Sequence, residues 1–263
     1  MSAIKFQNKS ICFTDDGKGK PIVLLHGFTE SSRMWKNLAV SLSKKYRVVC
    51  IDLPGHGKSE CINGVHTMDL MAEVVFMVLK KLRIGKCLMA GHSMGGYVTL
   101  AFAVKHPQML KGFTLFHSHC FSDTPGEQEN RKRTIELVKQ DKFGFLAQFI
   151  PELFPVEVHK KFAKPIEKLI RQSARMSKEG ITAALEGMKV RQDQSELLKT
   201  TKVPVLFIIG LKDPKAPMER LWEMITLPAR SEVLILRQCG HMGYIEAPEE
   251  TLAGLAGFAG KYA

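Results

Sequence analysis

The sequence lacks long hydrophobic runs. None of its 263 residues lie in an apolar stretch approaching the roughly 18–20 residues that a membrane-spanning helix needs, so we expect no membrane partner. Residues 1–20 mix charged and polar side chains with scattered apolar ones, which is not the pattern of a secretory signal peptide. We therefore expect a cytoplasmic protein.

The sequence also lacks paired cysteines. Its six cysteines form no CxxC motif and show no spacing typical of metal ligands. Cys50 and Cys87 lie in apolar runs typical of buried strands, where a thiol behaves as a small hydrophobic group. We expect no disulfides, no metal site and no cofactor.

The charge is one-sided but not concentrated. Lys and Arg number 38 against 26 Asp and Glu, which gives a net charge of +12, yet no segment forms a basic tail or an RNA-binding motif. We interpret the excess as a solvated surface and expect no nucleic-acid partner. With 45% hydrophobic and 24% charged residues, the composition is that of a globular chain of one or two domains.

Short apolar runs alternate with helical patterns in the first part of the chain. The predicted strands are 3–7, 10–14, 22–25, 47–51, 87–90 and 112–116, and the predicted helices are 35–44, 68–82 and 94–104. The alternation resumes with strands 205–209 and 233–236 and helices 218–225 and 248–258. This order predicts an α/β fold with a mostly parallel sheet and helices on both faces.

Residues 121–200 interrupt that alternation. They show helical patterns at 127–140, 143–149, from Pro165 and at 181–190, but no convincing strand. The predicted organisation is a core formed by residues 1–120 and 201–263, with a helical insertion at 121–200.

One motif carries the chemistry. Gly91-His92-Ser93-Met94-Gly95 follows an apolar run and precedes a helical pattern, which is the context of a nucleophile elbow. A serine hydroxyl needs a base, and the base needs an orienting acid. His241 and Asp213 each follow a later strand, in the order expected after such a serine, and Asp123 is a weaker alternative for the acid.

Acyl transfer also needs donors for the developing oxyanion. We expect these to be the backbone N–H groups of Phe28 and Met94. Side chains that could line the substrate pocket are His26, His92, Tyr97, His117, Phe145 and Phe149, with a structural role as the alternative for His26 and His92.

Taken together, these motifs resemble the α/β-hydrolase superfamily over nearly the whole chain. The resemblance rests on Leu25-His26-Gly27-Phe28, on Asp52-Leu53-Pro54-Gly55-His56-Gly57-Lys58-Ser59, on the elbow, and on Asp213 and Gly240-His241. It implies a mostly parallel eight-stranded sheet with an inserted helical cap, here residues 121–200. It also implies that residues 52–59 form a structural loop.

The serine at the elbow favours a carboxylic ester hydrolase acting on a small or medium acyl substrate. A thioesterase, a carrier-protein methyl esterase and the pyruvate-eliminating synthase of menaquinone biosynthesis remain alternatives, although Tyr97 stands where that synthase carries an arginine. A ligand-binding receptor on the same fold is the non-enzymatic alternative. Lys164, Lys168, Arg171 and Arg175 are spaced to share one helix side, which indicates either a solvated face or a surface for an acidic acyl carrier.

Overall fold

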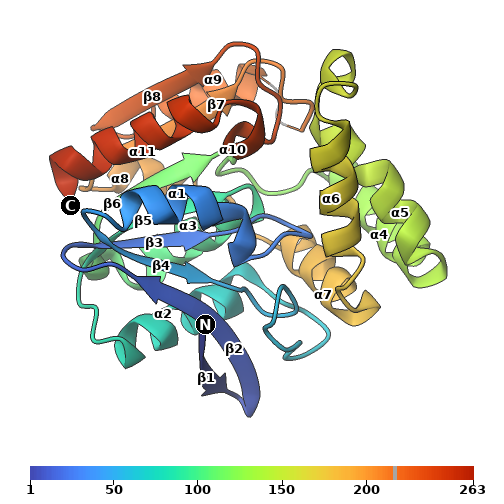
Figure 1. The fold of residues 1–263 in the computed structure, drawn as a ribbon, viewed down its shortest axis with the longest axis horizontal. Coiled ribbons are helices and arrows are strands. Elements are labelled where there is room, and N and C mark those ends of the chain that lie inside the picture. Colours follow the sequence, from blue (N-terminus) through green and yellow to red (C-terminus); the bar gives the residue numbers. More distant parts are fainter. Residues whose placement is uncertain (216–217) are drawn as a thin grey trace.

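A single sheet organises the molecule (Figure 1). The computed structural model describes residues 1–215 and 218–263. The strands are β1 Ser2–Phe6, β2 Lys9–Asp16, β3 Pro21–Leu25, β4 Arg47–Ile51, β5 Cys87–His92, β6 Leu110–Phe116, β7 Val205–Gly210 and β8 Ser231–Leu236. They lie side by side in the order β1-β2-β4-β3-β5-β6-β7-β8. Only β2 runs antiparallel to its neighbours β1 and β4, which confirms the predicted mostly parallel sheet of eight strands.

Helices cover both faces of this sheet, as predicted. Helices α1 Lys36–Leu42 and α11 Pro248–Tyr262 lie on one face, and α2 Met68–Lys81 and α3 Met94–Lys105 lie on the other (Figure 1). Alternate residues of a strand point to opposite faces, and in β3 this places Val23 in one core and Leu24 in the other. Because both faces are buried, β3 is apolar from Ile22 to Leu25.

The chain between β6 and β7 is helical. It forms α4 Pro125–Gln140, α5 Lys142–Phe149, α6 Ala163–Ser173, α7 Lys178–Lys189 and α8 Ser195–Thr200, and no residue from 121 to 200 lies in a strand. Figure 1 shows α4 to α7 grouped to one side of the sheet. After β7 come α9 Met218–Ile225 and, following β8, the short helix α10 Gly243–Glu246.

Two details of this segment differ from the sequence-based expectation. Helix α6 begins at Ala163 rather than at Pro165, because a proline is tolerated in a first turn, where the backbone N–H has no partner to lose. Helix α8 was not predicted. It has six residues and only Leu198 is buried, so its sequence has no amphipathic period long enough to detect.

The residues that follow the parallel strands lie at one edge of the sheet, where the carboxyl ends of those strands meet. Ser93 follows β5 directly, His117 follows β6, and the loops after β7 and β8 carry Asp213 and His241. The ends are tied together, since the Ser93 amide donates to the Phe116 carbonyl at 2.9 Å. This edge is where ligands bind in open α/β sheets. Among the described residues, no helix has both the length and the apolarity to cross a bilayer.

The loop after β4 is held by one buried carboxylate. Asp52 accepts hydrogen bonds from the backbone amides of Ser32 at 2.7 Å and Lys58 at 2.9 Å. Gly57 has a φ of +57°, and a side chain there would lie 2.3 Å from the Asp52 carboxyl group. The loop therefore needs both an acid at 52 and a glycine at 57.

We expect Asp52→Asn to lower the free energy of unfolding by about 1–3 kcal/mol, because an amide cannot accept from both backbone donors through two oxygens. Urea unfolding measures the change. Asp16→Asn removes an exposed charge at the end of β2 and serves as the control, with little expected loss. Equal losses in the two variants would contradict this role for Asp52.

Candidate functional site

Ser93 occupies a strained turn between β5 and α3. Its backbone has φ +50° and ψ −115°, a conformation that non-glycine residues rarely adopt. The turn leaves the residue half-buried, while the residues on either side are fully buried. Such a turn presents a side chain at the end of a buried strand, as the sequence motif predicts.

The glycines of the motif allow close backbone approach. A side chain at Gly91 would lie 2.1 Å from the Gly95 carbonyl, and one at Gly95 would lie 2.5 Å from the Leu25 carbonyl. Gly96 likewise faces Ser118, whose hydroxyl donates to the Ser93 carbonyl at 2.8 Å. Helix α3 can therefore start directly against β3 only because these positions lack Cβ atoms.

His241 and Asp213 are hydrogen-bonded to one another. The distance from His241 Nδ1 to Asp213 Oδ2 is 2.8 Å, and the Asp213 side chain is only 1% exposed. Burial alone would raise the pKa of Asp213, but attraction to His241, the hydrogen bond from His241 and the nearby His117 hold it well below its usual range. An ionised Asp213 accepts the Nδ1 proton, so Nε2 of a neutral His241 is left as the free base.

Asp213 faces a second imidazole. Nδ1 of His117 lies 3.3 Å from Asp213 Oδ2, and His117 has a φ of +47°. Burial lowers the pKa of His117 to about 4, so this ring is neutral at neutral pH. Of the two candidate acids, Asp213 contacts the histidine, whereas Asp123 is bound by Arg131 and Arg191.

His117, Asp213 and His241 also have the donor types of a metal site. Their ligand atoms lie within 4.8 Å of one another. The 2.8 Å separation of His241 from Asp213 is the length of a charge-assisted hydrogen bond, and this direct bond already accounts for the arrangement.

The two expected oxyanion donors come from the start of α3 and from the loop after β3. Met94 is the first residue of α3, where a backbone N–H has no partner within the helix, and Phe28 lies in the loop after β3. Neither amide donates to an acceptor among the described residues. Both groups therefore retain a free hydrogen-bonding capacity.

Helix α5 covers the Phe28 loop. The ring of Phe149 packs edge-on against Phe28 with centroids 5.6 Å apart, and that of Phe145 lies 6.5 Å from Phe28. Phe143, on the same helix, is 60% exposed. Tyr97, another candidate pocket residue, is half-buried. Its hydroxyl is hydrogen-bonded to His119 at 3.0 Å, and its ring lies beneath the guanidinium group of Arg191.

His26 has both ring nitrogens engaged by the backbone. Nε2 accepts from the Leu53 amide at 2.9 Å, so Nδ1 carries the proton and donates to the Gly27 carbonyl at 2.8 Å. The ring is fully buried. This geometry favours bracing of two loops over contact with a substrate.

His92 is likewise saturated, and its partners fix its charge. Nδ1 lies 2.9 Å from Glu30 Oε2, and Nε2 lies 2.9 Å from the carbonyl oxygen of His241. Both partners are acceptors, so both nitrogens donate, which only the protonated imidazolium can do. The side chains of His92 and Glu30 are 1% and 5% exposed, so the pair is a buried salt bridge.

Glu30 is the residue that sequence reasoning missed. Besides His92, it accepts from the hydroxyl of Tyr244 at 2.6 Å and from the Gly27 amide at 2.8 Å. It therefore joins the loop after β3, the turn at Ser93 and the segment after β8. A single acid in the otherwise uncharged stretch Phe28–Ser32 was the only signal in the sequence.

The pKa values of the pair record this coupling. Burial alone would raise the pKa of Glu30, but the charge of His92 and the hydrogen bonds from His92 and Tyr244 lower it to about 2. Burial by itself would lower the pKa of His92. Attraction to Glu30 outweighs the effect of burial, so the pKa of His92 is raised. Both shifts favour the charged forms of the pair.

Comparison with known proteins identifies the fold family. The family model for the α/β-hydrolase fold matches residues 20–248. The protein belongs to this family. A thermophilic esterase from Thermogutta terrifontis, solved with malate bound, superposes with a TM-score of 0.92 at 33% identity, over 96% of this chain and 94% of that one.

Two curated relatives show the range of substrates in the family. A pimeloyl-[acyl-carrier protein] methyl ester esterase from Nitrosomonas europaea is 28% identical over 92% of this chain and 96% of its own. An (E)-2-((N-methylformamido)methylene)succinate hydrolase from Acinetobacter baylyi is 24% identical, over 92% of this chain and 91% of that one.

We expect Glu30→Gln to lower the free energy of unfolding by about 3–5 kcal/mol between pH 4.5 and 6.5, because it leaves the His92 charge buried without a partner. The low pKa of Glu30 gives stability that is present above its ordinary value of 4.5 and is lost as the pH falls toward 2. The raised pKa of His92 gives stability that is complete below 6.5 and is lost as the pH rises through the folded-state value.

The difference between wild type and Glu30→Gln should therefore be largest between these limits and should shrink toward acid pH. Urea unfolding over a series of pH values measures it. Glu249→Gln, at an exposed position on α11, is the matched control with a small and pH-independent effect. A Glu30→Gln deficit of the same size in strong acid would contradict the ion pair.

Proposed function

We propose that the protein is a serine hydrolase that cleaves a carboxylic ester of a small or medium acyl group through an acyl-enzyme. The observation that carries the proposal is the 2.8 Å bond between His241 and Asp213 at the sheet edge where Ser93 stands in its strained turn. The esterase from Thermogutta terrifontis, at 33% identity, supports ester chemistry.

In the proposed mechanism, Ser93 Oγ attacks the ester carbonyl carbon while His241 Nε2 takes the hydroxyl proton. Asp213 remains ionised and stabilises the imidazolium that forms. The backbone N–H groups of Phe28 and Met94 donate to the oxyanion. His241 then protonates the leaving alcohol as the acyl C–O bond breaks. A water molecule, deprotonated by His241, attacks the acyl-enzyme, and His241 returns that proton to Ser93 Oγ as the acid is released.

The buried His92–Glu30 pair has a positioning role in this proposal. His92 donates to the carbonyl of His241, and Glu30 holds His92 and the amide of Gly27, which precedes Phe28. One rigid ion pair thus holds the base, the elbow and an oxyanion donor in place. This limits the reorganisation that catalysis would otherwise require.

We further propose that residues 121–200 act as a cap over this edge. The Leu153 carbonyl accepts from the His241 amide at 3.0 Å, and the Ser173 hydroxyl donates to the Thr29 carbonyl at 2.7 Å. With Phe145 and Phe149 packed on Phe28, helix α5 is placed to form a wall of the acyl pocket and to exclude water.

Replacing the acid tests the assignment of residues. Asp213→Asn should lower kcat for p-nitrophenyl butyrate by about 10³–10⁴-fold, because an asparagine favours the wrong tautomer of His241. Asp123→Asn should keep kcat near that of wild type, since its partners are Arg131 and Arg191. Thermal unfolding of both variants establishes that folded protein is compared.

The opposite pattern, with Asp123→Asn inactive and Asp213→Asn active, would contradict the assignment. Absence of turnover in folded wild type, on esters and thioesters alike, would favour a ligand-binding receptor instead.

The wall formed by α5 generates a second prediction. Phe149→Ala should raise kcat/KM for p-nitrophenyl octanoate relative to the acetate, because shortening a half-buried ring that contacts Phe28 enlarges the acyl pocket. Phe145→Ala should act in the same direction, with a larger loss of stability because its ring is only 6% exposed. Phe143→Ala on the exposed side of the helix is the matched control.

Kinetics on the two chain lengths and a melting temperature for each variant make the test. An equal loss of activity on both esters, together with a lowered melting temperature, would mean that the rings only pack the cap onto the core.

A further inference from the structure

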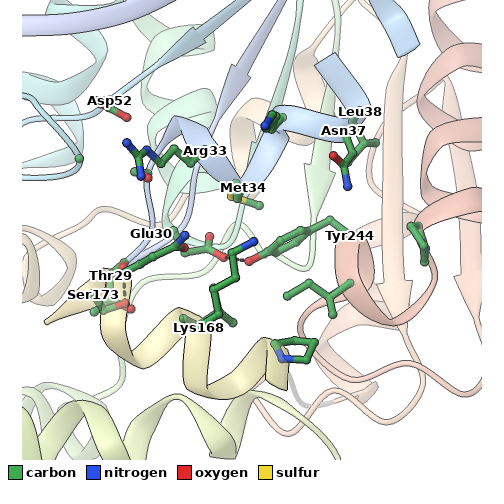
Figure 2. Close-up of a pocket in the computed structure, with 18 of the residues that line it drawn as sticks. Thr29, Glu30, Arg33, Met34, Asn37, Leu38, Asp52, Lys168, Ser173 and Tyr244 are labelled. Carbon is green, nitrogen blue, oxygen red and sulfur yellow. Dashed lines mark hydrogen bonds between the residues drawn. The ribbon is translucent and has the colours of Figure 1, made fainter. Parts of the chain in front are cut away.

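A large cavity lies outside the proposed catalytic group. It has a volume of about 770 Å³ and opens between α6, the segment of residues 29–38 and the segment of residues 244–252. Ser93, Asp213 and His241 are not among the residues that line it. Figure 2 shows Lys168 reaching from α6 toward Glu30 and Tyr244, with Arg33 and Met34 on the opposite side. We call this cavity the α6 groove.

Positive charge surrounds the α6 groove. Six exposed cations line it from four segments of the chain, namely Arg33, Lys36, Lys58, Lys164, Lys168 and Arg175. Within the described residues, none of the six side chains forms an ion pair or a hydrogen bond. Arg171, on the same helix, does not line the groove and pairs with Glu167 at 3.6 Å.

The acids that line the groove do not neutralise these charges. There are three, and two of them are committed to buried partners. Glu30 is bound by His92 and Tyr244, and Asp52 by the amides of Ser32 and Lys58. Only Glu249, at the start of α11, is exposed. The groove therefore presents a net positive field to solvent.

Apolar side chains line the groove between the cations, together with polar ones such as Asn37, Ser41 and Gln172. Met34 and Leu38 contribute from the core side, Leu169 from α6, and Ile245 and Leu252 from the last part of the chain. A volume of this size lies in the range of small-molecule sites, which are mostly apolar with a few polar groups that fix orientation. An apolar floor with a cationic rim is complementary to a molecule that has an apolar body and an anionic head.

We propose that the α6 groove is a binding site for an amphiphilic carboxylate, separate from the Ser93 site. The carboxylate lies at the rim formed by Lys168, Lys36 and their neighbouring cations, and the alkyl or aromatic body lies on the apolar floor. Of the four cations predicted to share one helix side, Lys164 and Lys168 on α6 and Arg175, two residues beyond the end of that helix, line the groove, whereas Arg171 does not.

Octanoate tests the proposal directly by isothermal titration calorimetry, in a readout that does not depend on enzyme activity. Wild type should bind it, and 1-octanol and acetate should each bind much more weakly. Lys168→Glu and Lys36→Glu, on opposite walls of the groove, should each weaken octanoate binding roughly tenfold because a repulsive charge replaces an attractive one. Arg171→Glu carries the same change of charge on α6 outside the groove and should bind as wild type does.

Octyl phosphate in place of octanoate distinguishes the head groups, and a carboxylate site binds octanoate at least as tightly. Equal loss in Arg171→Glu and Lys168→Glu would reduce the effect to general electrostatics and overturn the site. Octanoate affinity that survives both groove reversals would place the molecule elsewhere, including the Ser93 pocket. Binding of an acidic acyl-carrier protein lost in Lys168→Glu, with no octanoate binding, would make the groove a protein-docking surface and also overturn the proposal.

Discussion

The buried ion pair between Glu30 and His92 is the interaction on which the site depends. It lies where the loop after β3, the turn at Ser93 and the segment after β8 meet. Through His92 it fixes the His241 backbone, and through Glu30 it fixes Gly27 and Tyr244. A buried ion pair is stabilising only when further hydrogen bonds satisfy its remaining donors and acceptors. Here both partners make such hydrogen bonds.

This pair also explains how a strained serine turn can persist. The positive φ of Ser93 and the contacts of Gly91 and Gly95 with neighbouring backbone leave the elbow little freedom. His92 immediately precedes the serine and is anchored at both ring nitrogens. The strain at one residue is thus balanced by the fixed position of the residue before it. The segment between β6 and β7 is hydrogen-bonded to the same region through Leu153 and Ser173.

Much of this architecture could be predicted because local sequence patterns determine it. The apolar runs predicted the parallel strands. The positions of Ser93, Asp213 and His241 after three of these strands predicted that they lie at one edge of the sheet, and Asp213 and His241 are in contact there. Glu30 could not be predicted as a partner of His92, because 62 residues separate them and an acid in a loop is ordinarily solvated. The α6 groove was hidden for the same reason, since its walls come from distant segments. The stripe of cations on α6 was visible, but what it faces was not.

The central claim is that Ser93 is a nucleophile activated by His241 and Asp213. Intact-mass spectrometry after treatment with a fluorophosphonate tests it most directly, because the reagent bonds to an activated serine and mimics the acylation step. We expect wild type to gain the mass of one phosphonyl group on Ser93 and folded Ser93→Ala to gain none. Equal labelling of Ser93→Ala, or no labelling of folded wild type, would contradict it.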